Sequence, residues 1–129
     1  MGTKHLIDSN AVIEFLGGTL PSAGSDWMQN ICDQNLQYLS VINKIEVLGF
    51  NGSPSELLVF SEFIQAAQVI PLSEAVVQQT IEIRKIYKIK LSVAIIAATA
   101  MVHDLTLITR NTSDFYPIQQ LPCINVHHF

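Results

Sequence analysis

Short apolar segments alternate with longer segments of helical periodicity along this chain, and this alternation constrains the fold more than any other feature. The predicted strands are residues 4–7, 36–41, 69–72 and 105–109, with residues 123–126 as an edge strand. Strands separated by helices need crossover connections, which produce a mostly parallel sheet with helices on both faces. The sequence therefore predicts an α/β fold of three layers, α/β/α, around a mostly parallel central sheet.

Serines before three of the predicted helices are typical N-caps. After a loop over 19–24, Ser25 is expected to begin a helix that reaches about residue 34. Ser53 and Glu56 have the form of a capping box, and Ser92 is expected to cap the apolar helix over residues 91–102. Glycines end the helix over residues 9–16, so most helix boundaries can be predicted from single residues.

The 129 residues fit one domain, 1–129, and 49% of them are hydrophobic against 14% charged, which is enough to bury a core. The most apolar segment, residues 91–102, is shorter than the ~18 residues that a membrane span needs. Cys32 and Cys123 lack metal-binding spacing and suit a reducing cytosol. We therefore expect a cytoplasmic protein that does not enter a membrane.

The net charge of −4 argues against broad electrostatic contact with nucleic acid, so any such contact must be local. Basic residues that could steer RNA are Lys85, Lys88, Lys90 and Arg110. A solvated helix face explains the three lysines equally well. Both interpretations remain open at the level of sequence.

Carboxylates follow three of the predicted strands. Asp8 comes directly after the first strand, Glu46 lies about one helical turn beyond the second, and Asp114 follows the fourth. The functional crevice of such a sheet lies at the carboxyl ends of its strands, so we expect these groups to converge there. Clustered carboxylates repel one another, and Mg²⁺ or Mn²⁺ relieves that repulsion through oxygen ligands.

Each carboxylate also has a simpler interpretation. Asp8 could only cap a helix, Glu46 could be a solvated helix residue, and Asp114 could belong to a turn. Glu14 is expected to be a surface acid. The metal-site hypothesis depends on the three strand-end carboxylates occurring together in one chain.

Three longer segments resemble the motifs of the PIN-domain family, and in particular its toxin ribonucleases of the VapC type. They are HLIDSNAVIEFL (residues 5–16), SVINKIEVLGF (40–50) and IKLSVAIIAATAMVHDLTLITRNTSDF (89–115). The resemblance spans nearly the whole chain. It implies a PIN-like fold and a metal-dependent endoribonuclease that hydrolyses RNA phosphodiesters.

The resemblance also implies roles for individual residues. Asp8, Glu46 and Asp114 would be the catalytic, metal-binding carboxylates for Mg²⁺ or Mn²⁺. Asn10, Thr109 and Asn111 would support them or contact phosphate. The partners implied are RNA, a cognate antitoxin protein and a second copy of the chain in a homodimer.

Position 93 departs from the family's pattern. The third motif typically reads Leu, then Pro or Ser, then Asp, then Ala, but this chain has Val93 where the aspartate is expected. Valine can neither bind a metal nor orient water, and an Mg²⁺ site has few protein ligands to lose. We therefore expect weak metal binding and slow or absent RNA cleavage. The substitution is either introduced or natural, and the sequence does not separate the two.

Two other functions compete with the ribonuclease interpretation. A catalytically inactive PIN module could bind RNA or a protein partner without cutting anything. A flavodoxin-like or receiver-type domain also places an aspartate after its first strand, but the phosphate-loop glycines or central phosphoacceptor and later lysine that it needs are not evident. Metal binding would separate the first of these from the ribonuclease.

Overall fold

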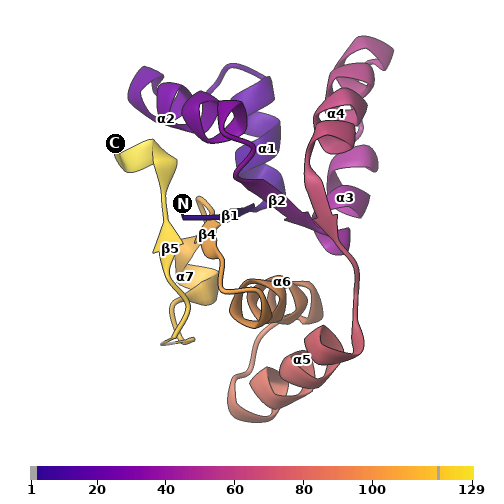
Figure 1. Cartoon of the computed structure of the whole chain (residues 1–129), viewed down its shortest axis with the longest axis vertical. Helices are drawn as coiled ribbons and strands as arrows, with labels where there is room; N and C mark the ends of the chain where they lie inside the picture. The colour runs from indigo at the N-terminus through magenta and orange to yellow at the C-terminus, as the bar shows by residue number, and fades with distance from the viewer. Residues whose placement is uncertain (1–2, 119) are drawn as a thin grey trace.

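Five parallel strands form one sheet in the computed structural model, which describes residues 3–118 and 120–129. The strand order is β3-β2-β1-β4-β5, and every neighbouring pair is parallel (Figure 1). The strands are β1 (His5–Ile7), β2 (Gln37–Ser40), β3 (Gln68–Ile70), β4 (Thr106–Ile108) and β5 (Cys123–Ile124). The parallel sheet predicted from the alternation is confirmed.

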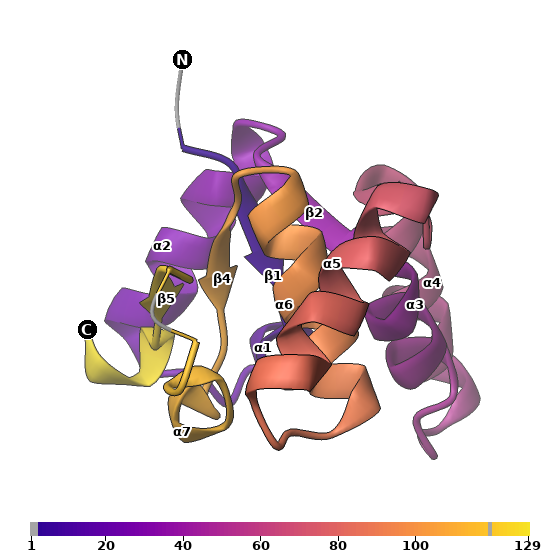
Figure 2. The same ribbon diagram turned by 90° about the horizontal axis from the view of Figure 1, so that it is seen from below.

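Helices cover both faces of the sheet. They are α1 (Ser9–Leu16), α2 (Ser22–Asp33), α3 (Val41–Leu48), α4 (Pro54–Ala66), α5 (Glu74–Ile86), α6 (Leu91–Val102), α7 (Thr112–Phe115) and the 3₁₀ helix η1 (Val126–His128). The first four lie on one side of the strands, and α5 and α6 lie on the other (Figures 1 and 2). The predicted three-layer architecture is therefore confirmed.

Two apolar cores form because successive strand residues face opposite sides. Leu6 and Leu107 pack in the core that contains α5 and α6, whereas their neighbours Ile7 and Ile108 pack in the core beneath α1 to α4. All four are completely buried. Helix α6 is buried over seven consecutive residues, Ala94–Ala100, so its nearly uniform apolar sequence reflects burial on most sides.

Several predicted boundaries are confirmed. Helices α1 and α6 have the predicted ends. In α4, the Ser53 side chain accepts from the Glu56 backbone at 3.2 Å and the Glu56 carboxylate accepts from the Ser53 backbone at 2.9 Å. This capping box satisfies two backbone N–H groups at the helix start.

Other predicted boundaries are wrong. Helix α2 begins at Ser22 rather than after Ser25, and its N-cap, Pro21, makes no side-chain cap. Gly24 lies in the first turn of this helix, where a Cβ would clash with the carbonyl oxygen of Val126, so only glycine lets η1 pack directly on α2. Ser92 lies inside the first turn of α6, and the N-cap residue is Lys90, which makes no side-chain cap either.

No helix within residues 3–118 and 120–129 is long and apolar enough to cross a membrane.

Candidate active site

Asp8 lies where β1 ends and serves as the N-cap of α1, with its side chain accepting from the Ser9 backbone at 2.9 Å. Its side chain is buried, and both carboxylate oxygens are hydrogen-bonded. Oδ1 also accepts from Nδ2 of Asn43 at 3.2 Å, and Oδ2 accepts from the hydroxyl of Thr109 at 2.8 Å. Asp8 is thus both the helix cap and the centre of a network that joins β1, α3 and the end of β4.

Asn43 is the residue that sequence reasoning missed. It is fully buried in the first turn of α3, where it forms a capping box with Ser40. Its Oδ1 accepts from the Ser40 backbone at 3.0 Å, while its Nδ2 donates to Asp8 and to the Ser9 hydroxyl at 3.0 Å. The signal in the sequence is an asparagine three residues after a serine at a strand end, which is a variant of the capping box.

Glu46 connects to Asp8 through Ser9. The Ser9 hydroxyl donates to Oε1 of Glu46 at 2.6 Å, and the same hydroxyl accepts from Asn43. Glu46 lies one turn along α3 from Asn43, on the exposed side of the network. Two carboxylates from different helices are therefore held in a fixed relation by one serine and one asparagine.

All three predicted carboxylates line one cavity of about 150 Å³ at the carboxyl ends of the strands. Asp8 contributes from the end of β1, as the N-cap of α1, Glu46 from α3 and Asp114 from α7. Val93, in the first turn of α6, lines the same cavity and adds an apolar side chain to its wall. The other polar residues of the lining are Ser9, Asn10, Lys90, Ser92 and Asn111.

The surroundings of Asp8 disfavour the ionised form of its carboxyl group. Burial raises the pKa of the Asp8 carboxyl above its ordinary value, and the neighbouring Glu46 carboxylate raises it further. Hydrogen bonds from Thr109, the Ser9 backbone and Asn43 act in the opposite direction but do not cancel the burial. A cation in the cavity would favour the ionised form.

The side chains present do not complete a divalent metal site. Among the residues that the structure describes, no group of three or more His, Cys, Asp or Glu side chains lies close enough together to hold an ion. Both oxygens of Asp8 and one of Glu46 already accept hydrogen bonds from the protein. The donor set, with valine at position 93, therefore fits Mg²⁺ or Mn²⁺ poorly.

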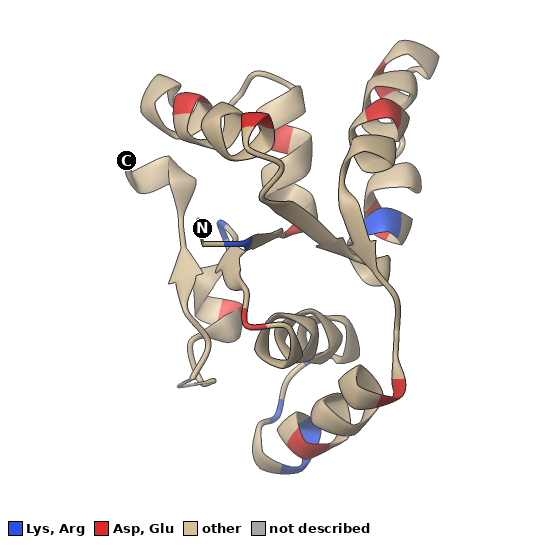
Figure 3. Cartoon of the chain, in the orientation of Figure 1, with Lys and Arg blue, Asp and Glu red and all other residues tan. Residues whose placement is uncertain are grey.

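Two of the predicted steering residues lie at the site, and two do not. Lys88 and Lys90 line an adjoining cavity of about 300 Å³ that shares Val93 and Asp114 with the first. Both lysines belong to the connection between α5 and α6, where Figure 3 shows basic residues in blue. Lys85 is exposed and pairs with Glu82 at 3.3 Å.

Arg110 forms a salt bridge with Glu14. The prediction that Glu14 is a surface acid is wrong, because this side chain is mostly buried. The Glu14 side chain is only 16% exposed and accepts from Arg110 Nη1 at 2.6 Å. Its other oxygen lies 3.1 Å from Nε2 of His127. These contacts join α1 to the segment after β4 and to η1, which makes Glu14 a structural residue.

The sequence model of one protein family, the PIN domain, matches residues 5–119 of this chain. A search of curated protein sequences finds no match. Among solved structures, a toxin–antitoxin complex from Klebsiella pneumoniae has a chain 27% identical to this one, with a TM-score of 0.79, over 95% of this chain and 98% of that one.

Two further structures share the fold at lower identity. FitAcB from Neisseria gonorrhoeae is 24% identical with a TM-score of 0.77, over 97% of this chain and 99% of that one. DNA-bound VapBC from Salmonella typhimurium is 20% identical with a TM-score of 0.80, over the same shares of the two chains. The family match covers residues 5–119, which is most of the 129 residues, and the chain belongs to the PIN domain family.

Proposed function

We propose that this chain carries the endoribonuclease site of a toxin-type PIN domain in an impaired form. One observation carries the proposal: Asp8, Glu46 and Asp114 line a single cavity at the strand ends, and Val93 lines the wall of that cavity. The reaction would be hydrolysis of an RNA phosphodiester with Mg²⁺ or Mn²⁺. The proposed impairment is weak metal binding.

The number of acidic ligands is the reason for the impairment. A Mg²⁺ ion takes few protein ligands and relies on carboxylates to offset the cost of shedding water. Here Asp8 is held by three hydrogen-bond donors and Glu46 by one, so neither carboxylate is free of internal partners. An aspartate at position 93 would add a carboxylate from the first turn of α6, where the helix dipole favours a negative charge.

A second candidate function is a PIN module that binds RNA or a protein without catalysis. The 2.6 Å hydrogen bond from Ser9 to Glu46 favours it, because it satisfies one carboxylate within the protein. Lys88 and Lys90 beside the acidic cavity would still attract a phosphate backbone. This candidate differs from the first only in the absence of cleavage.

An antitoxin is the proposed protein partner. Helices α3 and α4 and the turn between them expose large apolar side chains of a kind that proteins usually cover. They are Ile45, Leu48, Phe50, Leu58 and Val59. The Klebsiella pneumoniae structure is itself a toxin–antitoxin complex. The exposed side chains of Ile81 and Ile86 on α5 support a homodimer as well, which sedimentation of the purified chain would detect.

Cleavage of a labelled single-stranded RNA tests the proposed activity. The unmodified chain, Val93→Asp and Val93→Asn are compared with Mn²⁺, and Val93→Asp alone is expected to cut. Asn is the matched control because it has nearly the same shape without the charge. Adding Asp8→Asn to Val93→Asp should abolish the cleavage. Failure of Val93→Asp to cut would leave the non-catalytic module as the better account.

A further inference from the structure

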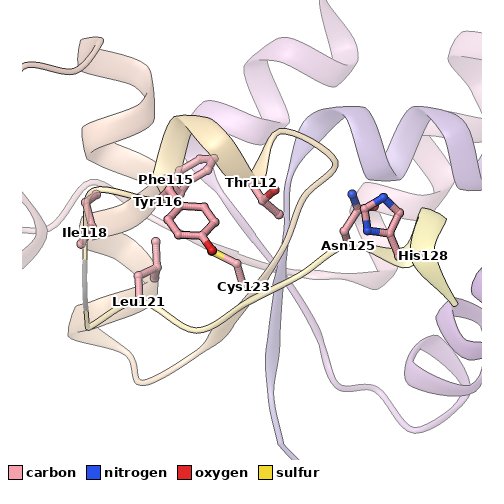
Figure 4. A pocket seen from close by; sticks show the side chains of 8 residues that line it. All are labelled: Thr112, Phe115, Tyr116, Ile118, Leu121, Cys123, Asn125 and His128. Carbon is pink, nitrogen blue, oxygen red and sulfur yellow. The ribbon is translucent and has the colours of Figure 1, made fainter.

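Another cavity lies beside α7 and is distinct from the acidic cavity. It has a volume of about 540 Å³, within the roughly 300–1,000 Å³ of small-molecule sites. Helix α7, strand β5 and helix η1 form its walls. Figure 4 shows the rings of Phe115 and Tyr116 toward one end, the side chains of Asn125 and His128 at the other, and Thr112 and Cys123 between them.

An aromatic ring stands open at this cavity. Tyr116 is 81% exposed, the most exposed of the large hydrophobic side chains that the structure describes. A ring left in water in this way is available to stack against another flat group, and stacking on aromatic side chains is how proteins hold unpaired bases. Phe115 is buried behind it and gives the cavity a fixed apolar floor.

The opposite end of the cavity offers hydrogen-bonding groups. The Oδ1 of Asn125 accepts from the His127 backbone at 2.9 Å. This bond fixes the orientation of the amide, with Nδ2 on the side away from the His127 backbone N–H. The imidazole of His128 and the hydroxyl of Thr112 also line the cavity. An aromatic face at one end and neutral donors and acceptors at the other match a nucleobase, which is flat and has a polar edge.

This cavity adjoins the acidic cavity at α7. Phe115 lines both cavities, and Thr112 follows Asn111 of the acidic cavity directly in the chain. Cys123, which lines this cavity, lies close enough to the acidic site to feel the charge of Asp8. Burial first, and then the Asp8 carboxylate, raise the pKa of the Cys123 thiol to about 11. A strand whose phosphate lay at Lys90, which lines the acidic cavity together with Asp114, would bring a neighbouring base toward Tyr116, two residues after Asp114.

We propose that this cavity is a nucleobase subsite, which holds one unpaired base of single-stranded RNA next to the phosphodiester at the acidic cavity. The base stacks on Tyr116, and its edge bonds with Asn125 and His128. None of the described residues that line the cavity is Asp, Glu, Lys or Arg, so these residues neither repel the strand nor compete for its phosphates. The proposal rests on the proposed function, because it uses the acidic cavity to place the strand.

The test is fluorescence anisotropy with a labelled single-stranded RNA of about 12 nucleotides, within the ~4–16 nucleotides that single-strand sites cover. The protein is the whole chain with Val93 in place, so that binding is measured without cleavage. Tyr116→Ala is expected to weaken binding by about 5- to 150-fold, the equivalent of one lost base stack. Tyr116→Phe keeps the ring and should bind like the unmodified chain. Ile86→Ala removes an equally exposed apolar side chain on α5 as the matched control.

A set of RNAs, each with one abasic nucleotide, identifies the base. One abasic position should weaken binding to the unmodified chain and have no further effect on Tyr116→Ala, because the stack is already lost. Equal binding by Tyr116→Ala and the unmodified chain would overturn the subsite. So would a change in sedimentation of Tyr116→Ala with unchanged RNA affinity, since the cavity would then face a second copy of the chain.

These outcomes are separable from those of the proposed activity. If Val93→Asp cuts RNA but Tyr116→Ala binds it normally, the nuclease stands and the subsite is wrong. If Val93→Asp does not cut but Tyr116 is needed for binding, the subsite stands and the chain belongs to a non-catalytic module. If the unmodified chain binds no single-stranded RNA, the subsite is contradicted, and the nuclease is contradicted as well if Val93→Asp does not cut.

Discussion

The buried amide of Asn43 donates a 3.2 Å hydrogen bond to Oδ1 of Asp8, and this contact holds α3 against the end of β1. The same nitrogen donates to Ser9, whose hydroxyl in turn donates to Glu46. Asn43 therefore positions both of the carboxylates that come from the first half of the chain. Its role is structural, because it reaches the acidic cavity only through its partners.

Replacing Asn43 by alanine should destabilise the fold. The change leaves the buried backbone N–H and hydroxyl of Ser40 without the acceptor that Asn43 supplies, and each buried unpaired group costs roughly 1–3 kcal/mol. We expect the free energy of unfolding, measured with urea, to fall by about 2–4 kcal/mol. Asn30→Ala, at an exposed position of α2, should change it by less than about 0.5 kcal/mol. Equal stabilities for the two variants would contradict the proposed role of Asn43.

The raised pKa of Asp8 predicts a pH-dependent penalty on folding. Burial places the folded-state pKa above the ordinary 3.8, so the folded protein binds this proton more tightly than the unfolded chain. The contribution of Asp8 to stability is therefore complete below pH 3.8 and is lost as the pH rises through the folded-state pKa. Asp8→Asn should unfold at a higher temperature than the unmodified chain at pH 7, and the difference should shrink toward pH 4.

Asp26→Asn is the control for this pH series, because Asp26 is exposed on α2 and makes no contact with the acidic network. Its melting temperature should follow that of the unmodified chain at every pH. Asp8→Asn would fail the prediction if it melted at the same temperature as the unmodified chain, or lower, at pH 7. That result would mean that the hydrogen bonds to Asp8 outweigh its burial.

The two cysteines allow a test of the charge on Asp8. Burial raises the pKa of both thiols from 9.0 to about 11, which lowers the thiolate fraction at pH 8 by about a hundredfold. The second cause differs between them: it is the Asp33 carboxylate for Cys32 and the Asp8 carboxylate for Cys123. Asp8→Asn should therefore speed the alkylation of Cys123 by iodoacetamide and leave that of Cys32 unchanged, as peptide mass spectrometry would show. A change at both thiols, or at neither, would contradict the proximity of Cys123 to an ionised Asp8.

The sequence was sufficient for the parts of the fold that depend on local signals. Local sequence predicts the ends of α1 and α6 and the Ser53–Glu56 capping box, because each depends only on residues that are neighbours in the chain. The start of α2 could not be predicted, because its N-cap residue, Pro21, makes no side-chain cap and leaves no local capping signal. The close packing of Gly24 on Val126 joins residues about a hundred positions apart in the chain. Ser92 was a reasonable cap by residue type, but α6 begins one residue before it.

The same division applies to the candidate site. The strand-end rule and the motifs identified Asp8, Glu46 and Asp114, and the structure brings all three to one cavity. Asn43 was missed because its contacts to Asp8 and Ser9 exist only after the helices pack. Glu14 was misjudged for a similar reason, because its partners, Arg110 and His127, come from the other end of the chain.

Binding of Mn²⁺, measured by titration calorimetry, tests the central claim most directly. The claim is that Val93 leaves the acidic cavity one carboxylate short of a metal site. The unmodified chain and Val93→Asn should show little heat, whereas Val93→Asp should bind Mn²⁺ at least about tenfold more tightly, equivalent to some 1.4 kcal/mol. Micromolar binding by the unmodified chain, with no gain in Val93→Asp, would contradict the claim.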